Sequence, residues 1–483
     1  MSLTTRALVA ICLMIGFYLL AISVSGGLLW LVYAQYAYFG RINRLSLAGI
    51  AGAFLILWSI MPRWDRFSPP GPRIEPSQHP TLFAVLNEIA AAMGQPMPRD
   101  IFLIPDVNAW VAQRGGLMGL ASHRVMALGM PLMALLNVSQ FRGVIAHEFG
   151  HYHGGDTKLG PWIYKTRSAI ARTLTELERR NSWLIILFRW YGDLFLKITL
   201  SISRNQEYAA DRIAAQYAGA QAMADGLKRI HCGGFAWQSY LMTEIRPVLS
   251  HGFSPPLGNG FRLFLENSDV DKAVQEDLKK ELREGKSDVL DSHPSLAERI
   301  AALGSAGGSQ PEDTRPATEL LNDFFSVDTS LFLTNGVTLS PLGWDQVTQQ
   351  VWAPSWQAQV NAQPELFQNM KVADLVHQLW SGKLRQRLKN PPGTWPTTEE
   401  REHMANMVAT SALNLTLLRD GWVFHMLPGE CYCIKNGKRL QPLQLMSEIA
   451  GRKMSLQQWE EICSTNAMGE LSLQQEKAIA ASS

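Results

Sequence analysis

The stretch Val144-Ile145-Ala146-His147-Glu148-Phe149-Gly150-His151 decides how the rest of the chain is interpreted. Its two histidines are four residues apart, so on a helix both imidazoles lie on one face. That spacing lets both bind one zinc ion from the same side, and Glu148 can then accept a proton from the water on the metal. Ser139 as a capping residue, followed by apolar residues, predicts a buried helix here.

A hydrolytic zinc site also needs a third protein ligand, with one position left open for water. A lone His-Glu-x-x-His match occurs by chance in long proteins, so a third ligand is needed to distinguish a zinc site from a chance match. The extended pattern with a third histidine soon after the pair fails, because position 157 is Thr157. His153 would point away from the pair, and we predict a surface or supporting residue there rather than a ligand.

Glu207 is the better candidate for the third ligand. Glu207 and Asp211 are four residues apart and would share one helix face. Such a pair suits a metal ligand and a carboxylate that orients a histidine. The alternative is a solvated helix face on which the two acids pair with Arg204 and Arg212. Together with the first motif, the pair favours the metal site.

Four motifs in order, from about Pro80 to Leu303, resemble the membrane zinc peptidases of the HtpX and CAAX prenyl protease family. They are Asn108-Ala109-Trp110-Val111, then Ala146-His147-Glu148-Phe149-Gly150-His151 followed by Gly155-Asp156, then Arg204-x-x-Glu207-Tyr208-x-Ala210-Asp211, and finally His293-Pro294-Ser295-x-x-Glu298-Arg299-Ile300.

The resemblance implies a set of roles for these residues. It implies one zinc ion per chain, held by His147, His151 and Glu207, with Glu148 as the general base. The residues expected to support the ligands are Asp211, Arg299 and Asp156. His293 is expected to donate a hydrogen bond to the oxyanion, with Tyr208 as an alternative donor. An edge strand containing Asn108, Ala109 and Trp110 is expected to contact the substrate. Without the resemblance, His293 would be a surface helix cap and Asn108–Val111 ordinary sheet.

The predicted fold class is α+β and mainly helical. At 483 residues the chain exceeds one ordinary domain. We predict a transmembrane helical hairpin over 1–67, a zincin-like catalytic domain with a small sheet over 68–303, a linker over 304–316 and a separate mixed C-terminal domain over 317–483. Within the catalytic domain, a helix is predicted near Leu82 and short strands over 100–105 and 124–128.

The C-terminal domain contains no catalytic constellation, so its predicted role is regulatory or substrate-selecting. Its dispersed tryptophans are typical of a core, or of a surface that binds chains or lipid headgroups. They are Trp344, Trp352, Trp356, Trp380 and Trp395. The segment from Trp422 through Asn436-Gly437 predicts a hairpin, and short helices are predicted over 443–449 and 456–462.

The N-terminal segment predicts a membrane anchor. No charged residue occurs from Ala7 to Gly40, which is more than enough to span a hydrocarbon core, nor from Leu45 to Met61. A cleaved signal peptide is the alternative, but the apolar stretch is long and a second one follows. More arginines flank the outer ends of this hairpin than its turn, which favours a cytoplasmic catalytic domain, in the inner membrane if the source is bacterial.

The apolar run over 183–202 is interrupted by Arg189, Asp193 and Lys197 at four-residue spacing, which predicts an amphipathic helix. In HtpX the corresponding region carries further membrane helices, so the chain departs from the family here. The helix is predicted to lie on the membrane surface or over the active site, or to be a plain core helix.

Composition excludes other classes of function. The net charge of +2, with basic residues spread along the chain, shows no nucleic-acid footprint. Five scattered cysteines do not form a disulfide framework and favour reduced thiols. We predict a membrane-anchored zinc endopeptidase that acts on protein or peptide substrates, either membrane-associated or misfolded, with the bilayer as its other partner. The alternatives are a catalytically silent scaffold or binding protein, which the intact motif disfavours, and a secreted soluble protease. Oligomeric state is not predicted.

Overall fold

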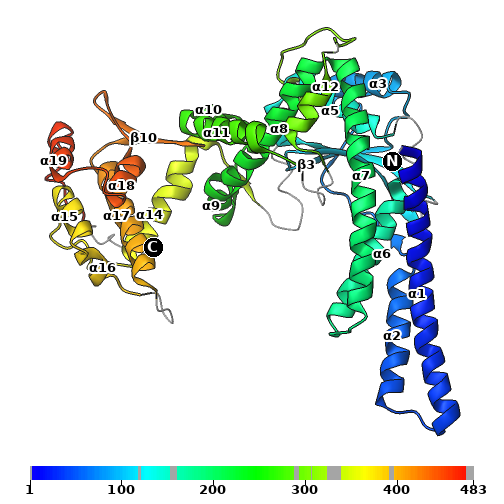
Figure 1. The fold of residues 1–483 in the computed structure, drawn as a ribbon. Coiled ribbons are helices and arrows are strands. Elements are labelled where there is room, and N and C mark those ends of the chain that lie inside the picture. The colour runs from blue at the N-terminus through cyan, green and yellow to red at the C-terminus, as the bar shows by residue number, and fades with distance from the viewer. Residues whose placement is uncertain are drawn as a thin grey trace. The chain divides into compact units, whose positions relative to one another are not determined.

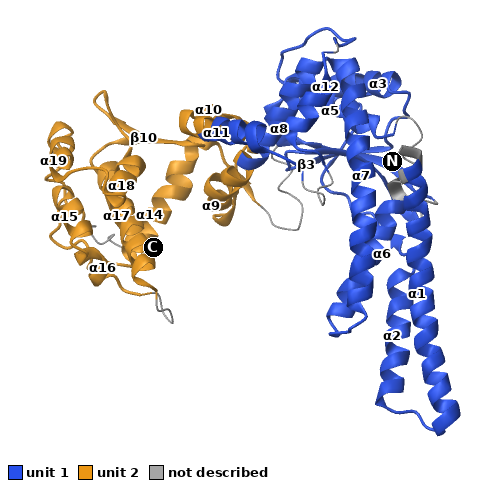
Figure 2. Ribbon diagram, in the orientation of Figure 1, with its two compact units in different colours: residues 1–235, 273–331 blue, residues 236–272, 332–483 orange. Residues whose placement is uncertain are grey.

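A computed structural model describes residues 3–117, 121–152, 160–287, 293–305, 307–323, 339–390 and 396–474. They form a mainly helical structure with small sheets, so the predicted α+β class is confirmed. The chain forms two compact units, residues 1–235 with 273–331, and residues 236–272 with 332–483 (Figure 2). Residues 236–272 lie within the range predicted for the catalytic domain, and the predicted domain boundaries remain a prediction.

Two apolar helices, α1 (Leu3–Phe39) and α2 (Arg44–Ile60), form the predicted hairpin (Figure 1). Asn43 caps α2, and the absence of a side chain at Gly49 lets α2 approach α1, because a Cβ there would lie 3.0 Å from Val32. Among the described residues, one helix is long and apolar enough to cross a membrane, over Ala7–Phe39. Because α2 has 17 residues, a second crossing remains a prediction.

The helices α6 (Gly160–Glu178) and α7 (Ile185–Ala218) pack beside this hairpin (Figure 1). The rings of Phe17 and Phe188 lie edge to face at 6.4 Å, and the hydroxyl groups of Ser59 and Thr173 are 2.8 Å apart. The three interrupting charges of α7 are all exposed, which confirms the predicted amphipathic helix. Its apolar face belongs to a core shared with α1, α2 and α6, as in a core helix.

The main sheet has the strand order β2-β3-β6-β4. Its strands are β2 (Arg73–Ile74), β3 (Asp100–Ile104), β6 (His123–Gly129) and β4 (Ala109–Arg114). β3 and β6 are parallel, and the other two pairs are antiparallel. Both predicted strands are present, and β4 is the predicted edge strand. Asn108 precedes β4, and its carbonyl accepts a hydrogen bond from Gly129 N–H at 2.8 Å.

Smaller elements complete the first unit. The short strands β1 (Trp64–Asp65) and β5 (Gly116–Leu117) pair with each other. The helix α3 (Pro80–Ala92) lies between β2 and β3 in sequence and matches the helix predicted near Leu82, and α4 (Met130–Leu135) follows β6 directly. The helix α12 (Leu296–Leu303) begins at a capping box formed by Ser295 and Glu298. The helices α8 (Ala220–Tyr240) and α11 (Ser268–Glu284) contribute residues to both units.

The helix α5 (Val138–Gly150) carries the deciding motif, and its predicted cap is wrong by two positions. Asn137 is the N-cap: its side chain accepts from Gln140 N–H at 2.8 Å, within a capping box. Asparagine and serine are both good caps, so sequence alone does not choose between them. The hydroxyl of Ser139 instead accepts from Asp313 N–H at 2.7 Å. The predicted linker thus bonds to the start of α5, and Ser309 N–H bonds to the carbonyl of Tyr217 in α7 at 3.0 Å.

The second unit is built around the long helix α17 (Thr398–Arg419). Trp344 and Trp356 are buried, while Trp352 and Trp380 are partly buried, so all four have the predicted core environment. Trp395 lies outside the described residues. The other helices are α9 (Arg246–Ser250), α10 (Leu257–Glu266), α14 (Ala353–Asn361), α15 (Leu375–Trp380), α16 (Lys383–Arg387), α18 (Pro442–Ala450) and α19 (Leu456–Thr465). The last two confirm the predicted short helices.

The predicted C-terminal hairpin is present, but it is one of two. β9 (Val423–Leu427), β10 (Glu430–Lys435) and β11 (Lys438–Leu440) form an antiparallel sheet in the order β11-β10-β9. Asn436 and Gly437 adopt positive φ, as a tight hairpin turn requires, and Gly429 has φ 77° in the other turn. The short strands β7 (Phe253–Ser254) and β8 (Ser340–Pro341) pair in parallel.

Candidate metal centre

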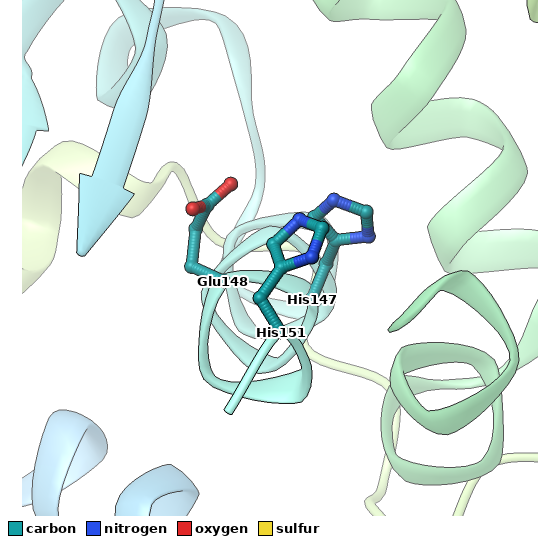
Figure 3. Close-up of side chains that lie close together, drawn as sticks. All are labelled: His147, Glu148 and His151. Carbon is teal, nitrogen blue, oxygen red and sulfur yellow. The ribbon is translucent and has the colours of Figure 1, made fainter. Parts of the chain in front are cut away.

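The two histidines of α5 lie together as their spacing predicts. The ring centroids of His147 and His151 are 4.7 Å apart. Figure 3 shows the imidazoles next to each other, with the Glu148 carboxylate projecting from the same helix beside them. One nitrogen of each ring and one Glu148 oxygen lie within 4.8 Å of one another. His147 is buried, whereas the side chain of His151 is 29% exposed, so the site opens on the His151 side.

Glu207 reaches both imidazoles from α7. Its two carboxylate oxygens lie 3.5 Å from Nε2 of His147 and 3.5 Å from Nε2 of His151. Close helix packing makes this possible, because a Cβ at Gly150 would lie only 3.2 Å from Cα of Ala210. The structure therefore brings together the three residues that the sequence proposes as ligands.

A second row of contacts lies behind His147. Oδ1 of Asp211 is 2.8 Å from Nδ1 of His147, on the ring edge opposite Glu207. Arg299 of α12 donates two hydrogen bonds to Asp211, at 2.8 and 2.6 Å, and lies 3.7 Å from Glu207. The predicted neighbourhood of Asp211 and Arg299 is present. Asp156 and His153 lie outside the described residues.

His293 lies at the exposed edge of the site. Its Nδ1 is 3.2 Å from a Glu207 oxygen, and its side chain is 65% exposed. Tyr208, the alternative donor, instead has Glu298 and Arg204 as charged neighbours. His293 is thus the one of the two candidates that faces Glu207.

The carboxylates of Glu207 and Asp211 favour a positive charge in the site. Although burial opposes its charged form, the nearby carboxylates of Asp211 and Glu207 raise the pKa of His147 to about 9. Burial, with the His147 charge, lowers the pKa of His151 to about 4. Burial also raises the pKa of Glu148 to about 7. Against the effect of burial, the close approach of His147 and His293 to its carboxylate holds the pKa of Glu207 far below its ordinary value.

The donor set fits a metal ion. Ligand atoms bound tetrahedrally to one zinc ion lie roughly 3.4 Å from each other, close to the 3.5 Å separations between Glu207 and the two imidazoles. One oxygen of Glu207 is buried without a hydrogen-bond partner among the described residues. This oxygen, Oε2, lies 3.5 Å from Nε2 of His147 and 3.7 Å from Arg299, and both distances are too long for a good hydrogen bond. A metal ion bound at Oε2 would satisfy this buried acceptor.

Tyr152 is a neighbour of the site that the sequence analysis did not identify. Its hydroxyl donates to the carbonyl of Val111 on β4 at 2.8 Å. Its position four residues after Glu148 was the available signal, because that spacing places both residues on one helix face.

The comparison with protein families decides how this geometry is classified. The model for peptidase family M48 matches residues 76–306, which contain every residue of the site. Residues 76–306 belong to peptidase family M48. This match supports a protease of a metallopeptidase family, and an apolar helix long enough to cross a membrane precedes the matched region.

Individual relatives agree with the M48 assignment. A protease HtpX homolog of Desulfatibacillum aliphaticivorans is 26% identical over 282 residues, which cover 52% of this chain and 79% of the relative. Protease HtpX of Idiomarina loihiensis is 26% identical over 215 residues, which cover 40% of this chain and 72% of the relative. A protease HtpX homolog of Acaryochloris marina is 28% identical over 177 residues, which cover 32% of this chain and 57% of the relative. No solved structure matches the chain.

Proposed function

We propose that the chain is a membrane-anchored zinc endopeptidase that hydrolyses peptide bonds in membrane-associated or misfolded proteins. The observation that carries the proposal is the approach of Glu207 to both histidines at 3.5 Å, which completes a three-ligand set of the hydrolytic type. His147, His151 and Glu207 would hold one zinc ion per chain. When bound, zinc would polarise the scissile carbonyl and make water more acidic.

Glu148 is the proposed general base. It would take a proton from the attacking water and later give it to the leaving amine. A pKa of about 7, raised by burial, suits a group that must both accept and return a proton. His293 is the proposed donor of a hydrogen bond to the oxyanion, because it reaches Glu207 from the exposed edge of the site.

Asp211 and Arg299 are proposed as positioning residues. Asp211 would fix the His147 ring through Nδ1, so that Nε2 points to the metal. The two hydrogen bonds from Arg299 would hold the Asp211 carboxylate in place. The free edge of β4 would pair with an extended peptide by strand addition. The proposed contact region is the start of this strand, at Ala109 and Trp110, with Asn108 directly before it.

Cleavage of an unfolded protein tests the function. The full chain, purified in detergent and loaded with zinc, is expected to cleave β-casein, while Glu148→Gln keeps its zinc and loses cleavage. Glu276→Gln, at an exposed position of α11, is the matched control and should cleave like the wild type. Equal cleavage by wild type and Glu148→Gln would point to a contaminating protease. One zinc per chain without cleavage of any substrate tested would favour the silent scaffold.

A further inference from the structure

We propose that Tyr152 is a specificity-determining residue that limits how far a substrate peptide can pair along β4. The proposal rests on the peptidase function proposed above, and concerns the length of peptide that the edge strand accepts.

The register of β4 identifies the backbone groups that a peptide would use. The bond from Gly129 N–H to the carbonyl of Asn108 shows that Asn108 faces β6. Backbone groups of successive strand residues point to opposite sides. Those of Ala109, Val111 and Gln113 therefore face away from β6, toward the free edge. An added peptide strand would bond to these three residues.

Tyr152 already occupies one of these positions. Its hydroxyl lies 2.8 Å from the carbonyl oxygen of Val111, where the N–H of an added peptide would donate. Within the described residues, the backbone groups of Ala109 and the N–H of Val111 have no hydrogen-bond partner. A peptide can therefore pair with Ala109 and with the N–H of Val111, but pairing beyond that point must displace the tyrosine.

Neighbouring residues hold the ring in place. The guanidinium of Arg124 lies 4.2 Å from the ring centroid, a cation–π contact. The side-chain amide of Gln95 donates to the Tyr152 carbonyl at 3.0 Å and accepts from Arg124 at 3.2 Å. Contacts with Arg124 on β6 and with Gln95 after α3 thus hold Tyr152 in the position where its hydroxyl blocks further pairing.

This stop lies close to the reacting bond. Tyr152 follows Glu148 by four residues, and His151 between them keeps helical dihedrals, so the two side chains are about one helical turn, ~5.4 Å, apart along the helix. A strand rises about 3.4 Å per residue. A peptide that runs along this direction would therefore pair about two residues between the scissile bond and Tyr152.

Two series of peptide hydroxamates would test the limit, because the hydroxamate anchors each peptide at the metal. One series is lengthened residue by residue in the N-terminal direction and the other in the C-terminal direction. Their dissociation constants are measured on the zinc-loaded full chain, on Tyr152→Phe and on the control Tyr164→Phe, at an exposed position of α6. In one series, wild-type affinity should stop rising after about two residues. In Tyr152→Phe it should rise for about two more, by roughly twofold to tenfold.

The direction of the effect separates this role from a structural one. A general loosening of the site would weaken both series equally, whereas loss of the stop strengthens one series at long lengths only. An identical length dependence in wild type and Tyr152→Phe, with zinc bound and casein cleaved, overturns the inference and leaves the proposed function intact. If the hydroxamates fail to bind the zinc-loaded chain and casein is not cleaved, the proposed function and the inference both fail.

Discussion

At the scale of single residues, the site consists of charges that neutralise one another at close range. The Glu207 carboxylate lies 3.5 Å from each imidazole and 3.7 Å from Arg299, and Asp211 contacts both His147 and Arg299. Against the effect of burial, Arg299 and His147 hold the pKa of Asp211 below its ordinary value, so Asp211 is an anion at neutral pH. A buried anion at Nδ1 makes His147 a stronger donor toward a metal.

Asp211→Asn should weaken zinc binding by about tenfold to 100-fold, because it removes the charge that orients His147 and leaves Arg299 without its bidentate partner. The measurement is a competition titration against a zinc chelator. Asp225→Asn is the control and should bind zinc like the wild type, because the Asp225 side chain on α8 is 37% exposed whereas that of Asp211 is 2% exposed. Unchanged affinity in Asp211→Asn would exclude the positioning role.

In the second unit, Glu244 should make stability depend on pH. Burial raises its pKa, although the Gly429 N–H opposes this shift. A carboxyl group with a raised pKa binds its proton more tightly in the folded state, so the free energy of unfolding falls as pH rises from the unfolded pKa of about 4.3 through the folded one. Glu244→Gln should therefore unfold at a higher temperature than wild type at pH 8 and at a similar temperature near pH 4. Calorimetry that shows the same difference at both values would contradict this prediction.

At the scale of elements, the crossing of α5 and α7 builds the centre, and sequence could predict only part of it. The helical spacing of His147 with His151, and of Glu207 with Asp211, is local and therefore visible in sequence. The amphipathic stripe on α7 and the edge position of β4 were also predictable. The true cap at Asn137, the hydrogen bonds of residues 309–316 and the contact of Tyr152 with β4 depend on which distant segments pack together, and periodicity carries no information on that.

Gly150→Ala should weaken both zinc binding and stability. The added methyl would lie 3.2 Å from the backbone of Ala210, so α7 must shift and carry Glu207 with it. Crowding of this kind costs about 1–3 kcal/mol, more than the ~0.5–1 kcal/mol gained by replacing a helical glycine. Gly143→Ala is the control, because its methyl meets side chains of Ala218 and Met223 at 3.4 Å. Chelator titration and thermal unfolding should show a loss in Gly150→Ala only.

At the scale of the whole molecule, the first unit contains both the proposed membrane anchor and the proposed peptidase site. The helix α7 connects the two functions, because its first half packs with α1 and α6 and its second half carries Glu207. The proposed anchoring by α1 and α2 would place the site near a bilayer, which is the reason for proposing membrane-associated substrates. The excess of arginines at the outer ends of the hairpin supports the proposed cytoplasmic orientation.

Cysteine labelling tests that orientation. In bacterial cells that express the chain with Cys12 replaced by alanine, a membrane-impermeant maleimide should label Ile42→Cys, in the exposed turn between α1 and α2, without lysis. It should label Lys280→Cys, on the exposed surface of α11, only after the membrane is opened. The reverse pattern would place the peptidase outside the cell.

The zinc content of Glu207→Gln tests most directly whether α5 and α7 together form a metal centre. The purified wild-type chain should hold one zinc ion, and Glu207→Gln should lose most of it at equal free zinc, because two imidazoles alone are an incomplete set. Glu298→Gln, at the exposed start of α12, should retain its zinc. Full zinc occupancy with an unchanged zinc absorption spectrum in Glu207→Gln would contradict the account.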